Sequence, residues 1–140
     1  MKLQITIITV LTHCFFFIDI IYREISKKYN QVNRSIGICL HSLSQVLAKA
    51  RGSDTVNLYT RHFSKWQQWV SQFPNTKAIP ADDTYVIAYM LNLFQTNKLF
   101  ENIRNSFFAI KYFQKITGYE NVLTGGLPYL VLEGIKRTSQ

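Results

Sequence analysis

The sequence predicts an all-α fold, a SAM-like bundle of four to five helices. From Ile38 onward the apolar residues recur three and four positions apart, which is the period of amphipathic helices. The six glycines and three prolines lie almost entirely between these periodic stretches, where helices begin and end. With 140 residues, 47% of them apolar, the chain has enough material for one domain with one core.

Residues 1–37 are expected to form a hydrophobic and then basic extension outside this domain. The stretch 3–21 is apolar, but polar residues such as Asp19 make it a marginal membrane span. It also lacks the cleavage site of a secretory signal. A membrane anchor, a loosely attached segment and an artefact of where the reading frame begins all remain open. Residues 22–37 are polar and basic, so they are interpreted as a linker, and the domain is expected to cover residues 38–140.

The first two helices of the domain are expected at residues 38–50 and about 53–73. Gly52 suits the end of the first helix, and Ser53 or Asp54 can cap the second. Pro74 should end the second helix. Its apolar stripe has the strongest period in the sequence and is expected to be core: Val56, Tyr59, Phe63, Trp66, Val70 and Phe73.

Three further helices are expected. The third begins after Pro80, with Asp82 and Asp83 as carboxylates that complement the helix dipole. The fourth runs from about Leu99 to Thr117, and the fifth covers about residues 127–136. The apolar stripes of the third and fourth helices contain Val86, Tyr89, Met90, Leu93 and Phe94, and then Leu99, Ile103, Phe107, Ile110 and Phe113.

The net charge indicates which kind of partner the protein binds. Sixteen Lys and Arg against eight Asp and Glu give a formal net charge of +8. A basic balance of this kind favours polyanionic partners, either nucleic acid or an anionic membrane surface, over an acidic small-molecule substrate.

Catalytic and metal-binding constellations are nearly absent from the sequence. The histidines are far apart, and the adjacent pair Asp82 and Asp83 is explained by its role at a helix start. Cys14 and Cys39 imply no disulfide framework and lack the spacing of a zinc motif. We therefore expect no catalytic residues, no metal and no cofactor.

Basic residues are organised on two of the expected helices. Arg61 and Lys65 are four positions apart on the second helix, opposite its apolar stripe. The fourth helix carries a longer basic row with amides at its margins: Arg104, Lys111 and Lys115, with Asn105 and Gln114. Such faces offer donors to phosphates and base edges, although an ordinary solvated surface has the same composition.

The order of residues from SDTVNLYTRHFSKWQQW through VIAYMLNL and IRNSFFAIKYF to VLEGIKR resembles a known family. It is similar to the N-terminal, SAM-like core-binding domain of tyrosine recombinases, the phage integrase family. The similarity runs from about Leu40 to Arg137. It rests on an aromatic helix with Tyr59, Phe63 and Trp66, followed by three helices with family-like spacing.

This resemblance implies a helical jaw of a clamp around duplex DNA, with the chemistry supplied by a separate C-terminal domain. The catalytic residues of the family lie beyond the position of Arg137, so the chain is expected to be non-catalytic as it stands. Tyr112, Tyr119 and Tyr129 are not expected to be nucleophiles. The implied partners are double-stranded DNA and recombinase-like subunits, in a context of DNA recombination or integration. The residues expected to contact the DNA are Arg61, Lys65, Arg104, Asn105, Lys111 and Lys115.

Another class remains open, a helical protein-interaction module, either with or without a membrane tether through residues 3–21. A nuclear or cytoplasmic location is expected for the DNA-binding alternative, and membrane attachment is the less favoured one.

Overall fold

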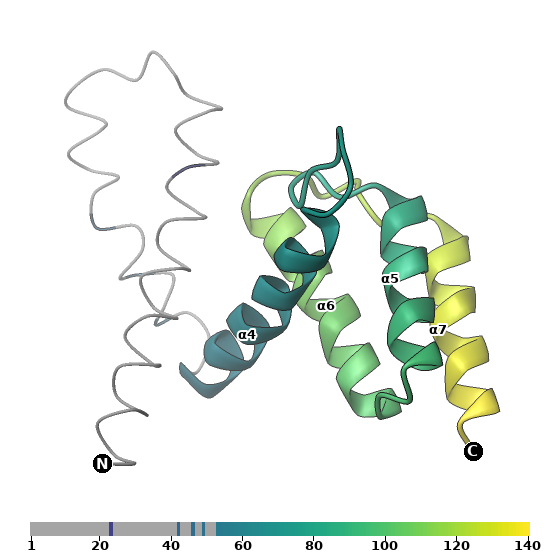
Figure 1. Cartoon of the computed structure of the whole chain (residues 1–140). Coiled ribbons are helices and arrows are strands. Elements are labelled where there is room, and N and C mark those ends of the chain that lie inside the picture. The colour runs from purple at the N-terminus through teal and green to yellow at the C-terminus, as the bar shows by residue number, and fades with distance from the viewer. Residues whose placement is uncertain (1–22, 24–41, 43–45, 47–48, 50–52) are drawn as a thin grey trace. The chain divides into compact units, whose positions relative to one another are not determined.

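The computed structural model describes residues 23, 42, 46 and 49 and the continuous range 53–140. Residues 53–140 form four helices, α4 (Ser53–Val70), α5 (Asp83–Gln95), α6 (Phe100–Ile116) and α7 (Gly126–Thr138), and contain no strand (Figure 1). The predicted all-α class is confirmed. The helix expected at 38–50 and the domain boundary near residue 38 lie outside the described residues, apart from isolated positions.

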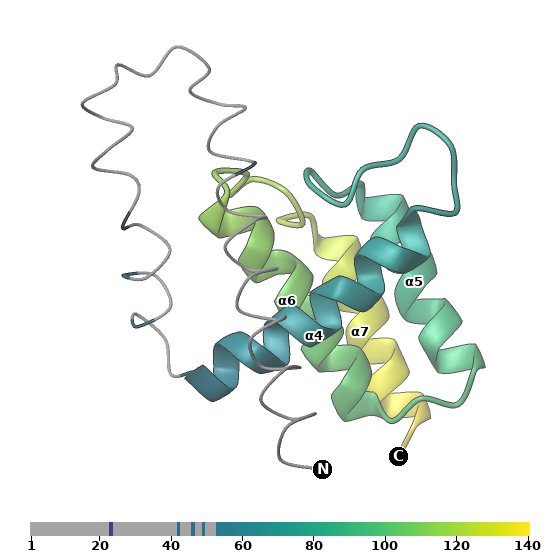
Figure 2. The same ribbon diagram turned by 60° about the vertical axis from the view of Figure 1, so that its left-hand side comes forward.

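The chain divides into two compact units, residues 1–60 and 61–140, and the division falls within α4. In the second unit α5 contacts both α6 and α7, and α6 contacts α7. Figures 1 and 2 show that α5, α6 and α7 run in alternating directions, so that α5 and α7 point the same way. The candidate site lies entirely in this second unit.

Helix α4 buries one face and exposes the other, as its period predicts. Phe63, Trp66 and Val70 are buried in the second unit. The helix ends at Val70, three residues before the predicted end. The hydroxyl of Thr76 donates to the carbonyls of Val70 (2.7 Å) and Phe73 (2.8 Å), which satisfies groups that a continuing helix would have used. The assignment of Phe73 to the core is wrong, because this residue lies in the turn and is 36% exposed.

The start of α5 confirms the predicted role of the two carboxylates. Asp82 is the N-cap residue, and its Oδ1 accepts the backbone N–H of Thr84 at 2.8 Å. Asp83 lies in the first turn, where a negative charge is favourable.

Helix α6 is the central helix of the core. Ile103, Phe107, Ile110 and Phe113 are fully buried, as predicted, and the Phe113 ring stacks on Phe63 of α4 at 4.3 Å between centroids. The prediction that Leu99 belongs to the same buried stripe is wrong, because Leu99 is the N-cap residue and is 73% exposed. Leu99 fits the apolar period, but the helix begins only at the next residue, Phe100.

Helix α7 agrees with its predicted range to within two residues. Pro128 lies in the first turn, and Leu132 and Ile135 are buried. Leu127 and Leu130 face outward with 62% and 68% exposure, so α7 has both a buried and an exposed apolar side.

Candidate nucleic-acid interface

The outer face of α4 carries the first predicted basic pair. Arg61 and Lys65 are both exposed, one helical turn apart, while Phe63 and Trp66 between and beside them are buried. The exposed side chains of Gln68 and Gln72 continue this face toward the C-terminal end of the helix. We call Arg61, Lys65, Gln68 and Gln72 the α4 outer face.

The α6 basic row has partners within the domain. Arg104 forms an exposed ion pair with Glu101 at 3.3 Å, and its guanidinium lies 5.8 Å from the centroid of the Phe108 ring. Lys111 is half-buried; its ammonium donates to the hydroxyl of Tyr129 and lies 4.7 Å from the centroid of that ring. The third member, Lys115, is exposed in the last turn. The row therefore presents positive charge at the surface, and Arg104 and Lys111 each have a partner within the domain.

The two amides predicted at the margins of this row have different positions. Asn105 is half-buried. Gln114 is fully buried, so its predicted place at the surface is wrong. Its Oε1 accepts the backbone N–H of Ala81 and its Nε2 donates to the carbonyl of Ala78, both at 2.9 Å. Gln114 thus fixes the loop between α4 and α5 on α6.

The two helices that carry the basic residues pack against each other through a buried polar contact. The Oγ of Ser106 on α6 lies 3.2 Å from the Nδ1 of His62 on α4. Ser106 also donates to the carbonyl of Asn102 at 2.8 Å and is hydrogen-bonded to the side chain of Tyr89 on α5. Because 44 residues separate His62 from Ser106, no local sequence motif signals this contact.

Electrostatics at this contact keep the imidazole neutral. Burial lowers the pKa of His62 to about 4, and the nearby cations Arg61 and Lys65 act in the same direction. Burial also raises the pKa of Tyr89 to about 12, and the neighbouring Ser106 side chain acts in the opposite direction. The outer cations and the inner imidazole therefore interact, although they lie on different sides of α4.

The His62 contact predicts acid sensitivity. The folded-state pKa lies below the ordinary value of 6.5, so the unfolded chain binds the proton more tightly and stability falls as the pH drops from 6.5 toward 4. Between pH 7.5 and pH 5 we expect the free energy of unfolding to fall by roughly 1 to 2 kcal/mol from this group. Urea unfolding at both pH values measures it, and His62→Gln should show a smaller acid loss. An equal fall in the free energy of unfolding for both proteins would show that His62 is not the cause of the acid sensitivity.

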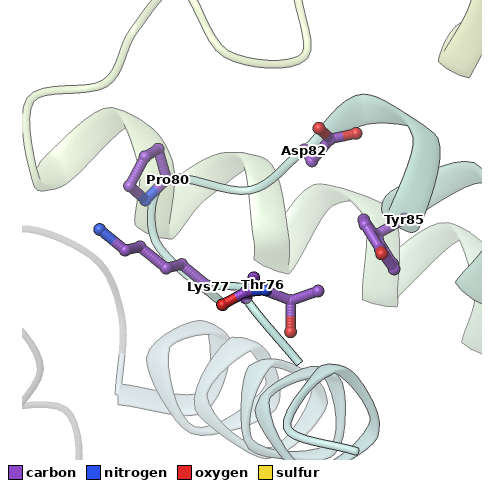
Figure 3. Close-up of a pocket in the computed structure, with 6 residues that line it drawn as sticks. Thr76, Lys77, Pro80, Asp82 and Tyr85 are labelled. Carbon is purple, nitrogen blue, oxygen red and sulfur yellow. The ribbon is translucent and has the colours of Figure 1, made fainter. Parts of the chain in front are cut away.

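A hollow of about 220 Å³ lies between the α4–α5 loop and the start of α5. Figure 3 shows Thr76 and Lys77 on the loop side and Asp82 and Tyr85 on the helix side. Its volume is below the range of about 300 to 1,000 Å³ typical of small-molecule sites. The opposite charges of Lys77 and Asp82 also give the hollow no preference for an anion.

Comparisons of the chain with protein-family models, with curated proteins and with solved structures find no match. Within the described residues, none of the helices combines the length and the apolar character that a membrane crossing requires. The same residues contain no cluster of three or more side chains suited to hold a metal ion.

Proposed function

We propose that the domain binds double-stranded DNA and is a non-catalytic module related to the core-binding domain of tyrosine recombinases. The observation that carries this proposal is the exposure of cations on α4 and α6, two helices that pack directly against each other. Residues 61–140 contain nine Lys and Arg against five Asp and Glu, so the unit as a whole favours a polyanion. The order of the helices and the aromatic pattern of α4 support the relation to the recombinase domain.

Within this proposal the α6 row contacts phosphates. Arg104 forms an exposed ion pair with Glu101 and Lys111 donates to Tyr129, so a phosphate would compete with these two partners for the cations. Phosphate contacts of this kind position a protein on the duplex but carry no sequence information. They also release counterions, so the affinity should fall steeply with salt.

The triple variant Arg104→Ala, Lys111→Ala, Lys115→Ala tests this role. Its log–log salt slope for duplex binding should be shallower by about 0.9 for each phosphate that the variant no longer neutralises, up to about 2.7. Its affinity at low salt should be clearly weaker. Fluorescence anisotropy of a labelled duplex at several salt concentrations measures both, with the full chain as the protein. A nicking assay in parallel should show no strand cleavage.

The matched control removes three exposed cations elsewhere, Lys98→Ala, Lys136→Ala and Arg137→Ala. It changes the net charge by the same amount, so a specific role for the α6 row requires a larger effect in the first variant. Thermal melts of both variants exclude unfolding as the cause. No binding by the unmodified protein at low salt, or equal slopes for all three proteins, would overturn the proposal, and a covalent protein–DNA adduct would overturn its non-catalytic part.

A protein-interaction module is the second candidate, and the surface of α7 favours it. Leu127 and Leu130 are strongly exposed and lie about one turn apart on the same side of the helix. Replacing both with Asp should leave DNA binding unchanged if they serve a protein partner.

A further inference from the structure

Helix α7 has a second apolar side that packs on no other element of residues 53–140. Its buried residues are Pro128, Leu132 and Ile135. Four further residues follow each other at spacings of three, one and three positions, which keeps them together on another side of the helix. They are Leu127, Leu130, Val131 and Gly134, and all except the half-buried Val131 are exposed. We call these four residues the α7 outer stripe.

Gly134 is an unfavourable residue for the middle of an exposed helix. Glycine loses more conformational freedom on folding than alanine and so destabilises the helix. The fold itself gives no reason for a glycine here, because a Cβ on Gly134 would meet no further heavy atom within 4 Å. A residue without a side chain does allow another backbone to approach closely. Next to the exposed leucines, Gly134 therefore gives the α7 outer stripe a position at which a second helix can pack.

Opposite charges lie at the two ends of the α5 and α7 pair. The two helices run in the same direction (Figures 1 and 2), and a Cβ on Gly125 would lie 3.5 Å from the Oδ2 of Asp83, so their starts are adjacent. Lys98 follows the end of α5, and Arg137 lies in the last turn of α7, where it pairs with Glu133. Within residues 53–140 the structure gives the side chains of Asp83 and Lys98 no hydrogen bond or ion pair. The start of the pair is therefore acidic at Asp83, and its end keeps a positive charge at Lys98.

We propose that two copies of this chain form a dimer in which their α7 outer stripes pack in antiparallel directions around a two-fold axis. This arrangement brings the acidic end of each copy to the basic end of the other, so the same attraction occurs twice. A parallel pair would bring like charges together. With the axis near Leu132, Leu130 of each copy lies opposite Gly134 of the other, because the two residues are equally far from that position.

The dimer names a partner for the exposed leucines of α7 and does not depend on the proposed DNA binding. Tyr129 contacts Lys111 and Phe107, so the side of α7 that carries Tyr129 faces α6. The α7 outer stripe lies on a different side of the helix. The α6 basic row therefore stays outside the proposed contact between the two copies.

Sedimentation equilibrium of the full chain at several concentrations, without DNA, tests the dimer. The fraction of dimer should rise with concentration for the unmodified protein. Leu130→Asp should weaken dimerisation by about a hundredfold, because a two-fold dimer loses the burial of one leucine in each copy. Leu99→Asp is the matched control, since Leu99 is 73% exposed and lies outside α7. This control should dimerise like the unmodified protein.

Gly134→Leu distinguishes close packing of two helices from non-specific attraction between apolar surfaces. The new side chain enters open space and leucine is a better helix former than glycine, so the monomer should stay folded. The added apolar surface should strengthen a non-specific association. The proposed dimer should instead weaken by about tenfold or more, because the leucine keeps the two backbones apart. Thermal melts of the variants check that each monomer is folded.

Charge reversal tests the antiparallel direction. Asp83→Lys alone, and the double variant Lys98→Glu, Arg137→Glu alone, should each dimerise more weakly at low salt, because both ends of each variant then carry the same sign. An equimolar mixture of the two variants should dimerise again, since every reversed end can meet an end of opposite charge. Sedimentation of the two variants and of their mixture measures this recovery.

Three results would overturn the inference: a chain that stays monomeric at its highest soluble concentration, association that Leu130→Asp or Gly134→Leu does not weaken, and a mixture of charge variants that shows no recovery. All of them are measured without DNA, so they leave the proposed DNA-binding function intact. A dimer that behaves as expected but binds no duplex would overturn only the proposed function.

Discussion

Replacing Trp66 with alanine should lower the free energy of unfolding by about 3 to 5 kcal/mol. The indole is fully buried, with ring centroids at 5.4 Å from Tyr89 and 6.0 Å from Trp69. Its Nε1 also donates to the carbonyl of Ala78 at 3.3 Å, so the substitution removes both packing and a link to the α4–α5 loop. Denaturant unfolding of the full chain measures the loss.

Lys65→Ala is the matched control, because it changes the preceding residue of the same helix on the exposed side. Its effect should be less than about 0.5 kcal/mol. Small and equal effects of the two substitutions would mean that the aromatic side of α4 is a surface, and the protein-interaction function would then gain support.

Replacing Gln114 with leucine should cost about 2 to 4 kcal/mol, although leucine fills nearly the same space. The substitution removes two hydrogen bonds to the α4–α5 loop and leaves the buried N–H of Ala81 without its acceptor. Each hydrogen bond is worth about 1 kcal/mol, and an unsatisfied buried donor costs a further 1 to 3 kcal/mol. The carbonyl of Ala78 keeps its bond from Trp66, which limits the total. Urea unfolding of the variant and the unmodified chain measures the difference.

Gln68→Leu provides the comparison for this effect, since it makes the same chemical change at an exposed position. Its effect on unfolding should be within about 0.5 kcal/mol. If Gln114→Leu proves as harmless as Gln68→Leu, the loop is not held by the amide.

The helices and most of the core could be predicted from the sequence because apolar period and burial have the same cause. A residue every three or four positions on a helix faces the same neighbour, so the period identifies Phe63, Trp66 and Phe107 as core. The predictions for Phe73 and Leu99 are wrong for one reason. Each residue continues a period beyond the point where backbone hydrogen bonds end the helix, and period alone does not mark that point.

The polar part of the interior could not be predicted in the same way. Gln114 and His62 look like ordinary helical polar residues, and their partners lie 33 and 44 residues away in the sequence. Their burial depends on how α4, the following loop and α6 meet. By contrast, the positions of Arg61, Lys65 and Lys115 at the surface follow from the helical period, because a residue opposite an apolar stripe faces solvent. Their function as DNA contacts stays a prediction.

The neutral imidazole between two exposed cations has a thermodynamic consequence. Arg61 and Lys65 both oppose a proton on His62. A polyanion bound to these cations would offset their repulsion, and proton uptake at the imidazole would become easier. By reciprocity, protonation of His62 would strengthen attraction for the polyanion by the same coupling free energy, provided that the domain stays folded. Since burial is the larger cause of the low pKa of His62, this coupling is small. A charged ligand on the surface would change the proton affinity of the buried imidazole without a conformational change.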